Sequence, residues 1–225
     1  MTAWTKDRFA DRAEAARALA ERVAVHLGTS AVESRPLVVA LPRGGAPIGA
    51  RVAEVIGGEL DVLVVRKIPA PGRPEYGVGA LTDDGVATFD RTALDQLGLT
   101  EQDLAETVEL ERAEARRRLR RYRGDRPALD VRNRIVVVVD DGLATGVTAR
   151  AALRRLRAGG PRRLILAVPV CSAAARAAMA TEADRVICLL TPADFAAVSR
   201  WYADFRQLTD RDVELALARV PVPSR

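Results

Sequence analysis

Residues 134–148 read Arg-Ile-Val-Val-Val-Val-Asp-Asp-Gly-Leu-Ala-Thr-Gly-Val-Thr, and we expect the rest of the chain to be organised around this stretch. Val136 to Val139 form a short run of β-branched residues, which is typical of a strand buried on both faces of a parallel sheet. The run stops at Asp140 and Asp141, small residues follow, and Ala149 to Ala158 has a helical pattern. The stretch therefore predicts a strand, a tight loop and a helix.

The predicted loop has the chemistry of a phosphate site. The first amides of a helix lack intrahelical partners, and the helix dipole places roughly half a positive charge there. Gly146 lets the backbone approach an anion, and Thr145 and Thr148 add hydroxyl donors. Asp140 and Asp141 would repel a phosphate, so we expect them to accept sugar hydroxyls or to be outer partners of a Mg²⁺ that screens the phosphates. The loop predicts an anion, a polyol and a cation.

This combination of apolar run, acid pair and Thr-Gly-x-Thr resembles the signature of type I phosphoribosyltransferases, and Val136 to Thr148 matches it at every class-defining position. In that family the acid pair, here Asp140 and Asp141, contacts the 2′ and 3′ hydroxyls of phosphoribosyl pyrophosphate. The resemblance implies an α/β fold: a mostly parallel twisted sheet flanked by helices, with a helical insertion and a small lid or hood. It also implies Mg²⁺ as a cofactor. The residues that it implies for the ribose 5-phosphate are Ala144, Thr145, Gly146, Val147 and Thr148.

The composition is that of an ordinary globular protein. The chain has 225 residues, of which 48% are hydrophobic and 29% charged, so we expect one domain over residues 1–225 that carries a lid. A net charge of +5 suits an anionic ligand or nucleic acid, although a generally arginine-rich composition would explain it equally well.

Several classes of site and location are not expected. Cys171 and Cys188 lie in no Cys-x-x-Cys motif or Cys/His cluster, which argues against a disulfide framework or a zinc site. His26 is the only histidine, so histidine-based acid–base schemes have little to work with. The N-terminus lacks an apolar signal core, and no apolar run approaches the ~18 residues of a membrane span. We expect a cytoplasmic protein without a membrane segment.

A second candidate anion site precedes the first. Residues 7–27 have helical spacing, Leu37 to Leu41 reads as a buried strand, and a helix is expected over residues 46–56. Between that strand and helix lie Arg43, Gly44 and Gly45, which offer free backbone amides and one positive charge. In the family that the chain resembles, the loop after the first sheet strand binds pyrophosphate. A plain tight turn is the alternative.

A basic pair follows the next strand. Leu60 to Val65 is predicted to be buried and to end at Arg66 and Lys67, where open α/β sheets bind ligands. The resemblance implies that Lys67 reaches pyrophosphate during catalysis and that Arg66 helps to bind the substrate, whereas the alternative is two solvated charges. Residues 68–79 are too rich in Pro and Gly for a regular element. They resemble the mobile loop that closes over the reacting sugar in this family.

Residues 68–123 are expected to form this loop followed by a helical insertion. A long helix ends near Tyr122, with acidic residues in its first half and six arginines between Arg116 and Arg123. The gradient complements the helix dipole, which is a sufficient structural reason for it. Binding of nucleic acid by the arginine run is the less expected alternative.

Two late strands and an aromatic tail complete the chain. Residues 163–168 and 185–190 are predicted strands around a helix at 172–180, and residues 191–225 are expected to form the hood. Four of the nine aromatic residues lie between Phe195 and Phe205. Trp201 and Tyr202 are therefore candidates for stacking on an acceptor base, while a hydrophobic lid or a dimer contact is the alternative.

The resemblance implies transfer of ribose 5-phosphate from phosphoribosyl pyrophosphate to a nitrogenous, purine- or pyrimidine-like acceptor, with release of pyrophosphate. Hypoxanthine-guanine enzymes of the family carry an aspartate where this chain has Ala144, so the chain looks more like the adenine or orotate branches. The Glu75-Tyr76-Gly77 segment is similar to one in adenine phosphoribosyltransferases, which makes Glu75 a candidate for proton handling. Family members often complete the site at a dimer contact, so the resemblance favours a homodimer.

Two other functions stay open. One is a regulator that senses phosphoribosyl pyrophosphate and binds nucleic acid through the arginine run of residues 116–123. The other is a Mg²⁺-dependent phosphatase or phosphorylase that uses the same anion loops on another sugar phosphate.

Overall fold

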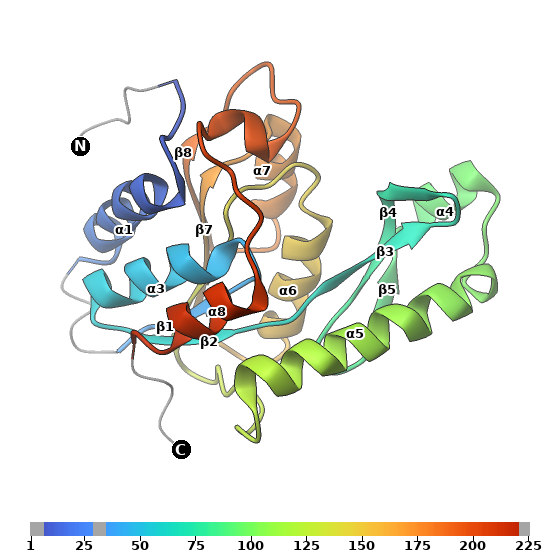
Figure 1. The fold of residues 1–225 in the computed structure, drawn as a ribbon, viewed down its shortest axis with the longest axis horizontal. Coiled ribbons are helices and arrows are strands. Elements are labelled where there is room, and N and C mark those ends of the chain that lie inside the picture. Colours follow the sequence, from blue (N-terminus) through green and yellow to red (C-terminus); the bar gives the residue numbers. More distant parts are fainter. Residues whose placement is uncertain (1–6, 29–34, 221–225) are drawn as a thin grey trace.

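The body of the protein is a five-stranded parallel sheet with the order β2-β1-β6-β7-β8 (Figure 1). The structure, a computed structural model, describes residues 7–28 and 35–220. The N-terminal residues 1–6, which bear on the expected absence of a signal core, and the last five residues of the expected hood lie outside this part. The strands of the sheet are β1 (Leu37–Ala40), β2 (Glu59–Val62), β6 (Ile135–Val139), β7 (Arg163–Val170) and β8 (Arg185–Leu190).

Helices cover both faces of this sheet, which confirms the predicted α/β class. The apolar run Val136 to Val139 lies in strand β6, and all five residues of this strand are buried. Alternate residues of β6 face opposite sides, so Val137 and Val139 pack in one core and Val136 and Val138 in the other. The first core contains α1 (Arg12–Leu27), α3 (Gly45–Ile56) and α8 (Asp210–Leu217), and the second contains α6 (Val147–Arg157) and α7 (Ala173–Met179).

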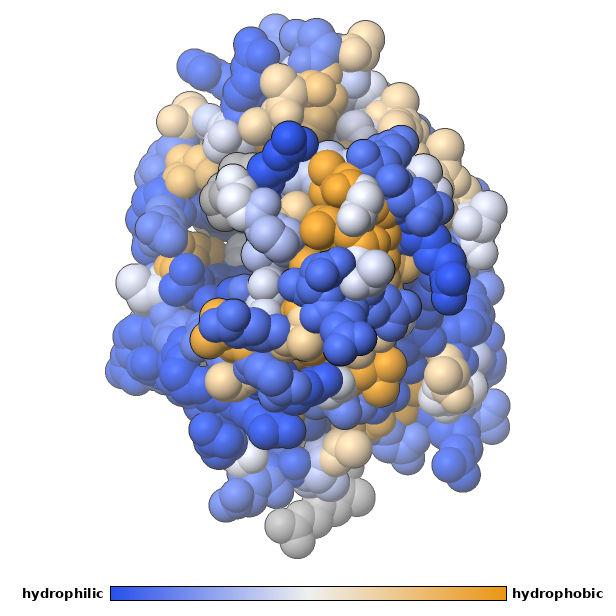
Figure 2. All heavy atoms as spheres, turned by 90° about the vertical axis from the view of Figure 1, so that its right-hand side faces the viewer, coloured by the Kyte–Doolittle hydropathy of each residue, from blue (hydrophilic) through white to orange (hydrophobic). Residues whose placement is uncertain are grey.

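A second, antiparallel unit projects from the body (Figure 1). Its three strands are followed by a helical segment that returns to the body through the long helix α5. In Figure 2, which faces this side of the molecule, hydrophilic residues cover most of the surface, and the hydrophobic residues include a group near its centre. The elements are β3 (Arg66–Ala70), β4 (Arg73–Leu81), β5 (Ala87–Phe89), α4 (Arg91–Leu97), the 3₁₀ turn η1 (Gln102–Leu104) and α5 (Ala105–Arg123).

The expectation of an irregular segment at residues 68–79 was therefore wrong. Strands β3 and β4 pair as an antiparallel hairpin, with register shifts on both sides of Pro69. The prolines lie where the ladder is irregular or at the turn, which is how a strand tolerates a residue without an N–H donor. The Pro and Gly content of residues 68–79 therefore did not indicate the hairpin that the structure shows.

Two other predicted boundaries were wrong. The strand expected over residues 60–65 ends at Val62, and Arg66 begins β3 instead of closing the buried strand. The helix expected from residue 7 begins at Arg12, because the Asp11 side chain accepts the Glu14 amide as an N-cap. Phe9 lies outside the helix, where its amide donates to the Trp201 carbonyl.

The C-terminal part returns across the body. It contains a short 3₁₀ turn, η2 (Val198–Trp201), and then α8, which packs against both α3 and α5. Within residues 7–28 and 35–220, no helix is long and apolar enough to cross a membrane.

Candidate functional site

The two predicted anion loops meet because β1 and β6 are parallel neighbours. Ala40 pairs with Val139 at the carboxyl ends of these strands, and the Leu41 amide donates to the Val139 carbonyl at 2.9 Å. A Cβ atom on Gly44 would lie only 2.1 Å from Asp141 Oδ2, and one on Gly45 would lie 2.4 Å from the Val139 carbonyl oxygen. The loop of Arg43, Gly44 and Gly45 therefore touches the acid pair, and only glycines permit this approach.

The acid pair has partners within the protein. The Asp141 amide donates to Asp140 Oδ1 at 2.8 Å, so the Asp140 carboxylate fixes the backbone of Asp141. Arg12, at the start of α1, reaches Asp141 Oδ2 through Nε at 2.9 Å and Nη2 at 2.8 Å. Arg12 was not among the predicted site residues, since a charged residue in the first turn of a covering helix carries no local signal of a site.

Burial shifts both carboxyl pKa values in the same direction. Burial raises the pKa of Asp140 well above its ordinary value, and the neighbouring Asp141 charge raises it further. Burial also raises the pKa of Asp141, against the lowering effect of Arg12. Titratable groups whose pKa values are shifted by burial and by a neighbouring like charge are concentrated at functional sites. The shifted pKa values of Asp140 and Asp141 thus make the acid pair a candidate for a functional site at this edge of the sheet.

The predicted phosphate loop leads into α6 as expected. Gly146 is the N-cap of the helix and has φ of +76°, a conformation that favours glycine. The loop is tied to the end of β7, since Ser172 Oγ donates to the Ala144 carbonyl at 2.7 Å and the Leu143 amide donates to the Val170 carbonyl. Ala144 and Thr145 are exposed, whereas Val147 and Thr148 are half-buried at the helix start.

Basic residues surround a cavity of about 380 Å³ beside Gly44. Arg43 and Arg66, both predicted to bind substrate, line it together with Arg12 and Arg118, which were not predicted. Arg118 lies in α5, so the inserted helix contributes to this edge of the body. Arg118 is one of six arginines between Arg116 and Arg123, and nothing in their spacing indicates which of them lines the cavity.

Lys67 and Glu75 lie in the antiparallel unit. Lys67 is in β3, and its aliphatic part packs over Gly77 of β4, where a Cβ atom would lie 2.8 Å from Lys67 Cδ. The backbone of Glu75 belongs to β4, but its side chain lies outside the described part of the structure. The catalytic roles of both residues stay predictions.

The aromatic tail supports the acid pair through its tyrosine, Tyr202. The Tyr202 hydroxyl donates to the Asp141 carbonyl at 2.6 Å, and the Tyr202 ring packs against Phe9 and Phe205 with centroid distances of 5.4 and 4.9 Å. Tyr202 is only 4% exposed, which leaves little ring surface for a base. Trp201 is half-buried. Tyr202 therefore positions the loop, and the stacking role of the two aromatics stays a prediction.

Comparisons with known proteins agree with this geometry. The family model for the phosphoribosyl transferase domain matches residues 7–203. The crystal structure of the protein TT1426 from Thermus thermophilus superposes with a TM-score of 0.77 and 41% identity, covering 95% of this chain and 99% of that one.

Curated relatives agree as well. Rv0571c of Mycobacterium tuberculosis strain H37Rv, provisionally named a phosphoribosyl transferase, is 42% identical over 94% of this chain and 46% of its own length. The chain thus spans about half the length of the curated relatives it matches. The domain model matches most of the chain, and a relative of the same extent is 41% identical, so this chain belongs to the phosphoribosyltransferase family.

Proposed function

We propose that the protein transfers ribose 5-phosphate from phosphoribosyl pyrophosphate to a nitrogenous, purine- or pyrimidine-like acceptor and releases pyrophosphate. The observation that carries this proposal is the contact between Gly44 and Asp141. It places a loop suited to pyrophosphate beside a carboxylate pair suited to ribose hydroxyls, with the amides of α6 available for the 5-phosphate.

In the proposed reaction the acceptor nitrogen forms a bond to ribose C1 with its lone pair, and the bond from C1 to the pyrophosphate oxygen breaks with its electron pair leaving on pyrophosphate. The acceptor nitrogen loses its proton, and Glu75 is the candidate to accept it. Positive charge develops on the sugar and negative charge on the leaving group. The protein must therefore mainly orient the two reactants and stabilise these charges in the transition state. Asp140 and Asp141 would hold the sugar hydroxyls and favour the cationic ring. The Gly45 amide donates to the Leu41 carbonyl at 3.0 Å and is not available to the leaving group, which corrects the expectation of a free amide there. The Gly44 amide and Arg43 would face the leaving group, with Lys67 reaching it from β3.

The residues present fit a Mg²⁺ ion that is held mainly by the donor. Two adjacent carboxylates, Asp140 and Asp141, offer the oxygen ligands that this ion prefers. Across the described ranges there is no group of three or more His, Cys, Asp or Glu side chains that could bind a metal by itself. When bound, Mg²⁺ would neutralise part of the pyrophosphate charge, and the acid pair would serve as its outer partner.

Titration calorimetry of phosphoribosyl pyrophosphate with Mg²⁺ tests the donor site. Wild type is expected to bind only when Mg²⁺ is present, and a variant with Asp140→Asn and Asp141→Asn is expected to lose at least about tenfold in affinity, since two charged hydrogen-bond acceptors are removed. Pyrophosphate release should then appear with a purine or pyrimidine base as acceptor. Release of inorganic phosphate instead would indicate a phosphatase or phosphorylase, and absence of wild-type binding would refute the transferase.

A further inference from the structure

The inserted helix α5 contributes Arg118 to the lining of the cavity beside Gly44. Four arginines from four different segments line this cavity of about 380 Å³: Arg12 from α1, Arg43 from the loop after β1, Arg66 from β3 and Arg118 from α5. Its volume falls within the range of roughly 300–1,000 Å³ that small-molecule sites occupy. A cavity that four guanidinium groups line has the charge to attract a multiply charged anion.

Each of these arginines has a carboxylate partner that does not line the cavity. Arg66 Nε binds Glu111 at 2.6 Å and Arg118 Nε binds Glu114 at 2.7 Å. Arg12 is held by Asp141 in the same way, and Arg43 lies 3.9 Å from Asp210. A guanidinium has five N–H donors, so a single carboxylate fixes its direction and leaves donors for a ligand.

The anchor of Arg118 is stable across the working pH range. Hydrogen bonds from Arg117 first, and then from Arg118, lower the pKa of Glu114 to about 2 despite its partial burial. Glu114 is therefore ionised wherever the protein would be assayed. Arg118 is itself only 12% exposed, which means that its orientation is set by packing as well as by charge.

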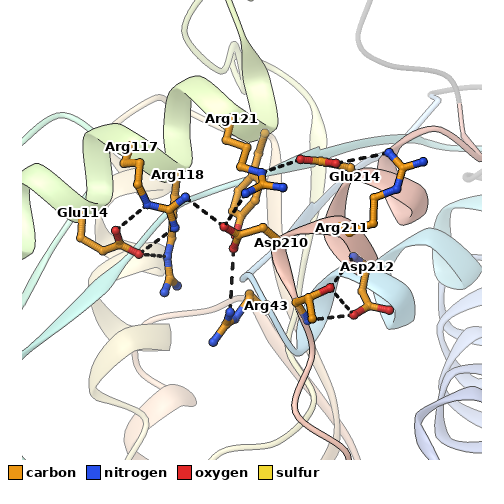
Figure 3. Close-up of polar contacts among 11 residues, drawn as sticks. Arg43, Glu114, Arg117, Arg118, Arg121, Asp210, Arg211, Asp212 and Glu214 are labelled. Carbon is orange, nitrogen blue, oxygen red and sulfur yellow. Dashed lines mark hydrogen bonds and ion pairs between the residues drawn. The ribbon is translucent and has the colours of Figure 1, made fainter.

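The other arginines of α5 have different roles. Arg117 and Arg121 converge on Asp210 of α8, as Figure 3 shows, whereas Arg118 pairs with Glu114 on its own helix. Arg116 and Arg120 are exposed on the same helix. The arginine run is thus divided between anchoring α8, lining the cavity and facing solvent, which does not make the uniform basic face that nucleic-acid binding would use.

We propose that Arg118 binds the pyrophosphate group of the donor, so that the inserted helix forms one wall of the donor site. This inference rests on the proposed function. The pyrophosphate gains negative charge as its bond to ribose C1 breaks, and a fixed guanidinium stabilises that charge more than it stabilises the intact donor. Arg118 acts together with Arg43 and Arg66, which line the same cavity.

Calorimetry on two arginine variants of α5 tests the assignment. Arg118→Ala is expected to weaken binding of phosphoribosyl pyrophosphate with Mg²⁺ by about tenfold or more, and to weaken inorganic pyrophosphate with Mg²⁺ similarly. Arg116→Ala removes the same charge from the same helix at an exposed position and should change both affinities less than about twofold. Arg118→Lys keeps the charge but not the planar fork and should lie between them.

Binding of ribose 5-phosphate distinguishes a loss of the pyrophosphate contact from a general loss of structure in Arg118→Ala. This ligand lacks the pyrophosphate, so its affinity should be equal in wild type and in Arg118→Ala; an equal loss for all three ligands would show a merely structural role and overturn the inference. Equal donor affinity in Arg118→Ala and Arg116→Ala would overturn it while leaving the transferase intact. Wild-type binding of pyrophosphate without binding of the donor would refute the proposed function and retain the anion pocket.

Discussion

The charge of Asp140, a single residue, is expected to favour binding of the donor and to lower the stability of the fold. Its pKa is raised by burial and by the Asp141 charge, so the folded protein binds its proton more tightly than the unfolded chain does. The ionised form therefore destabilises the fold above the raised pKa, and this cost disappears as pH falls through it. We expect Asp140→Asn to weaken donor binding and yet to stabilise the protein at neutral pH, by on the order of 1 kcal/mol.

Thermal unfolding at neutral and mildly acidic pH checks this expectation. The gain of Asp140→Asn over wild type should shrink as the pH is lowered, because wild type then loses the same charge by protonation. Asp125→Asn, at an exposed position, is the control and should be neutral. A gain that is constant with pH would mean that the carboxylate charge is not its source.

Gly44 offers a test of the contact that carries the proposed function. Its backbone has φ of −59° and ψ of −40°, which any residue can adopt, so Gly44→Ala alone would ordinarily be mildly stabilising. The added Cβ would, however, lie 2.1 Å from Asp141 Oδ2. We expect a loss of about 1–3 kcal/mol in the free energy of unfolding, measured by urea denaturation.

The origin of that loss can be checked by a double-mutant cycle. Adding Asp141→Ala removes the carboxylate that the new methyl group would strike, so the Gly44→Ala cost should largely vanish in that background. An unchanged cost would place the strain elsewhere in the loop.

At the scale of elements, α5 is joined to the main sheet by a buried ion pair. Arg123, at the end of the helix, binds both oxygens of Asp61 in β2 at 3.0 and 3.1 Å, and their side chains are 6% and 2% exposed. Removing one partner leaves the other charge buried, so Asp61→Ala should cost about 3–5 kcal/mol in the free energy of unfolding. Urea denaturation measures the loss, and hydrogen exchange should show faster opening of α5.

An exposed pair provides the comparison for this prediction. Arg51 and Glu54 form an ion pair on α3 with side chains 46% and 35% exposed, so Glu54→Ala should cost less than about 1 kcal/mol. Equal losses in Asp61→Ala and Glu54→Ala would show that burial of the α5 pair does not decide its contribution.

At the scale of the whole molecule, the donor should stabilise the fold because it would bridge loops from the parallel sheet and the antiparallel unit. A ligand at about 100 times its Kd stabilises the native state by about 2.7 kcal/mol. We therefore expect phosphoribosyl pyrophosphate with Mg²⁺ to raise Tm by several degrees and to slow amide exchange in the hairpin of β3 and β4, where Arg66 and Lys67 lie.

Mg²⁺ alone and ribose 5-phosphate alone are the controls. Ribose 5-phosphate should protect the start of α6 without protecting the hairpin, since it lacks the group that the arginine-lined cavity would bind. Protection of both regions by ribose 5-phosphate would contradict the division of the donor site between the two units.

The sequence by itself was enough to predict the strand, loop and helix of residues 136–158 and the second loop at Arg43, Gly44 and Gly45. These features are local: an apolar run of strand length, a glycine at the start of a helix, and carboxylates directly after a strand. The parallel order of the sheet followed from them, because such units bury their strands on both faces.

Only the tertiary structure decided which distant residues complete the site. Arg12 reaches Asp141 across 129 positions, Tyr202 lies against the same loop, and Arg118 alone of the α5 arginines lines the cavity beside Gly44. The hairpin of residues 66–81 was hidden for a related reason, since its strands are defined by their pairing and not by their composition. Periodicity records which face of an element is buried, whereas the partner that a side chain meets depends on how whole elements pack.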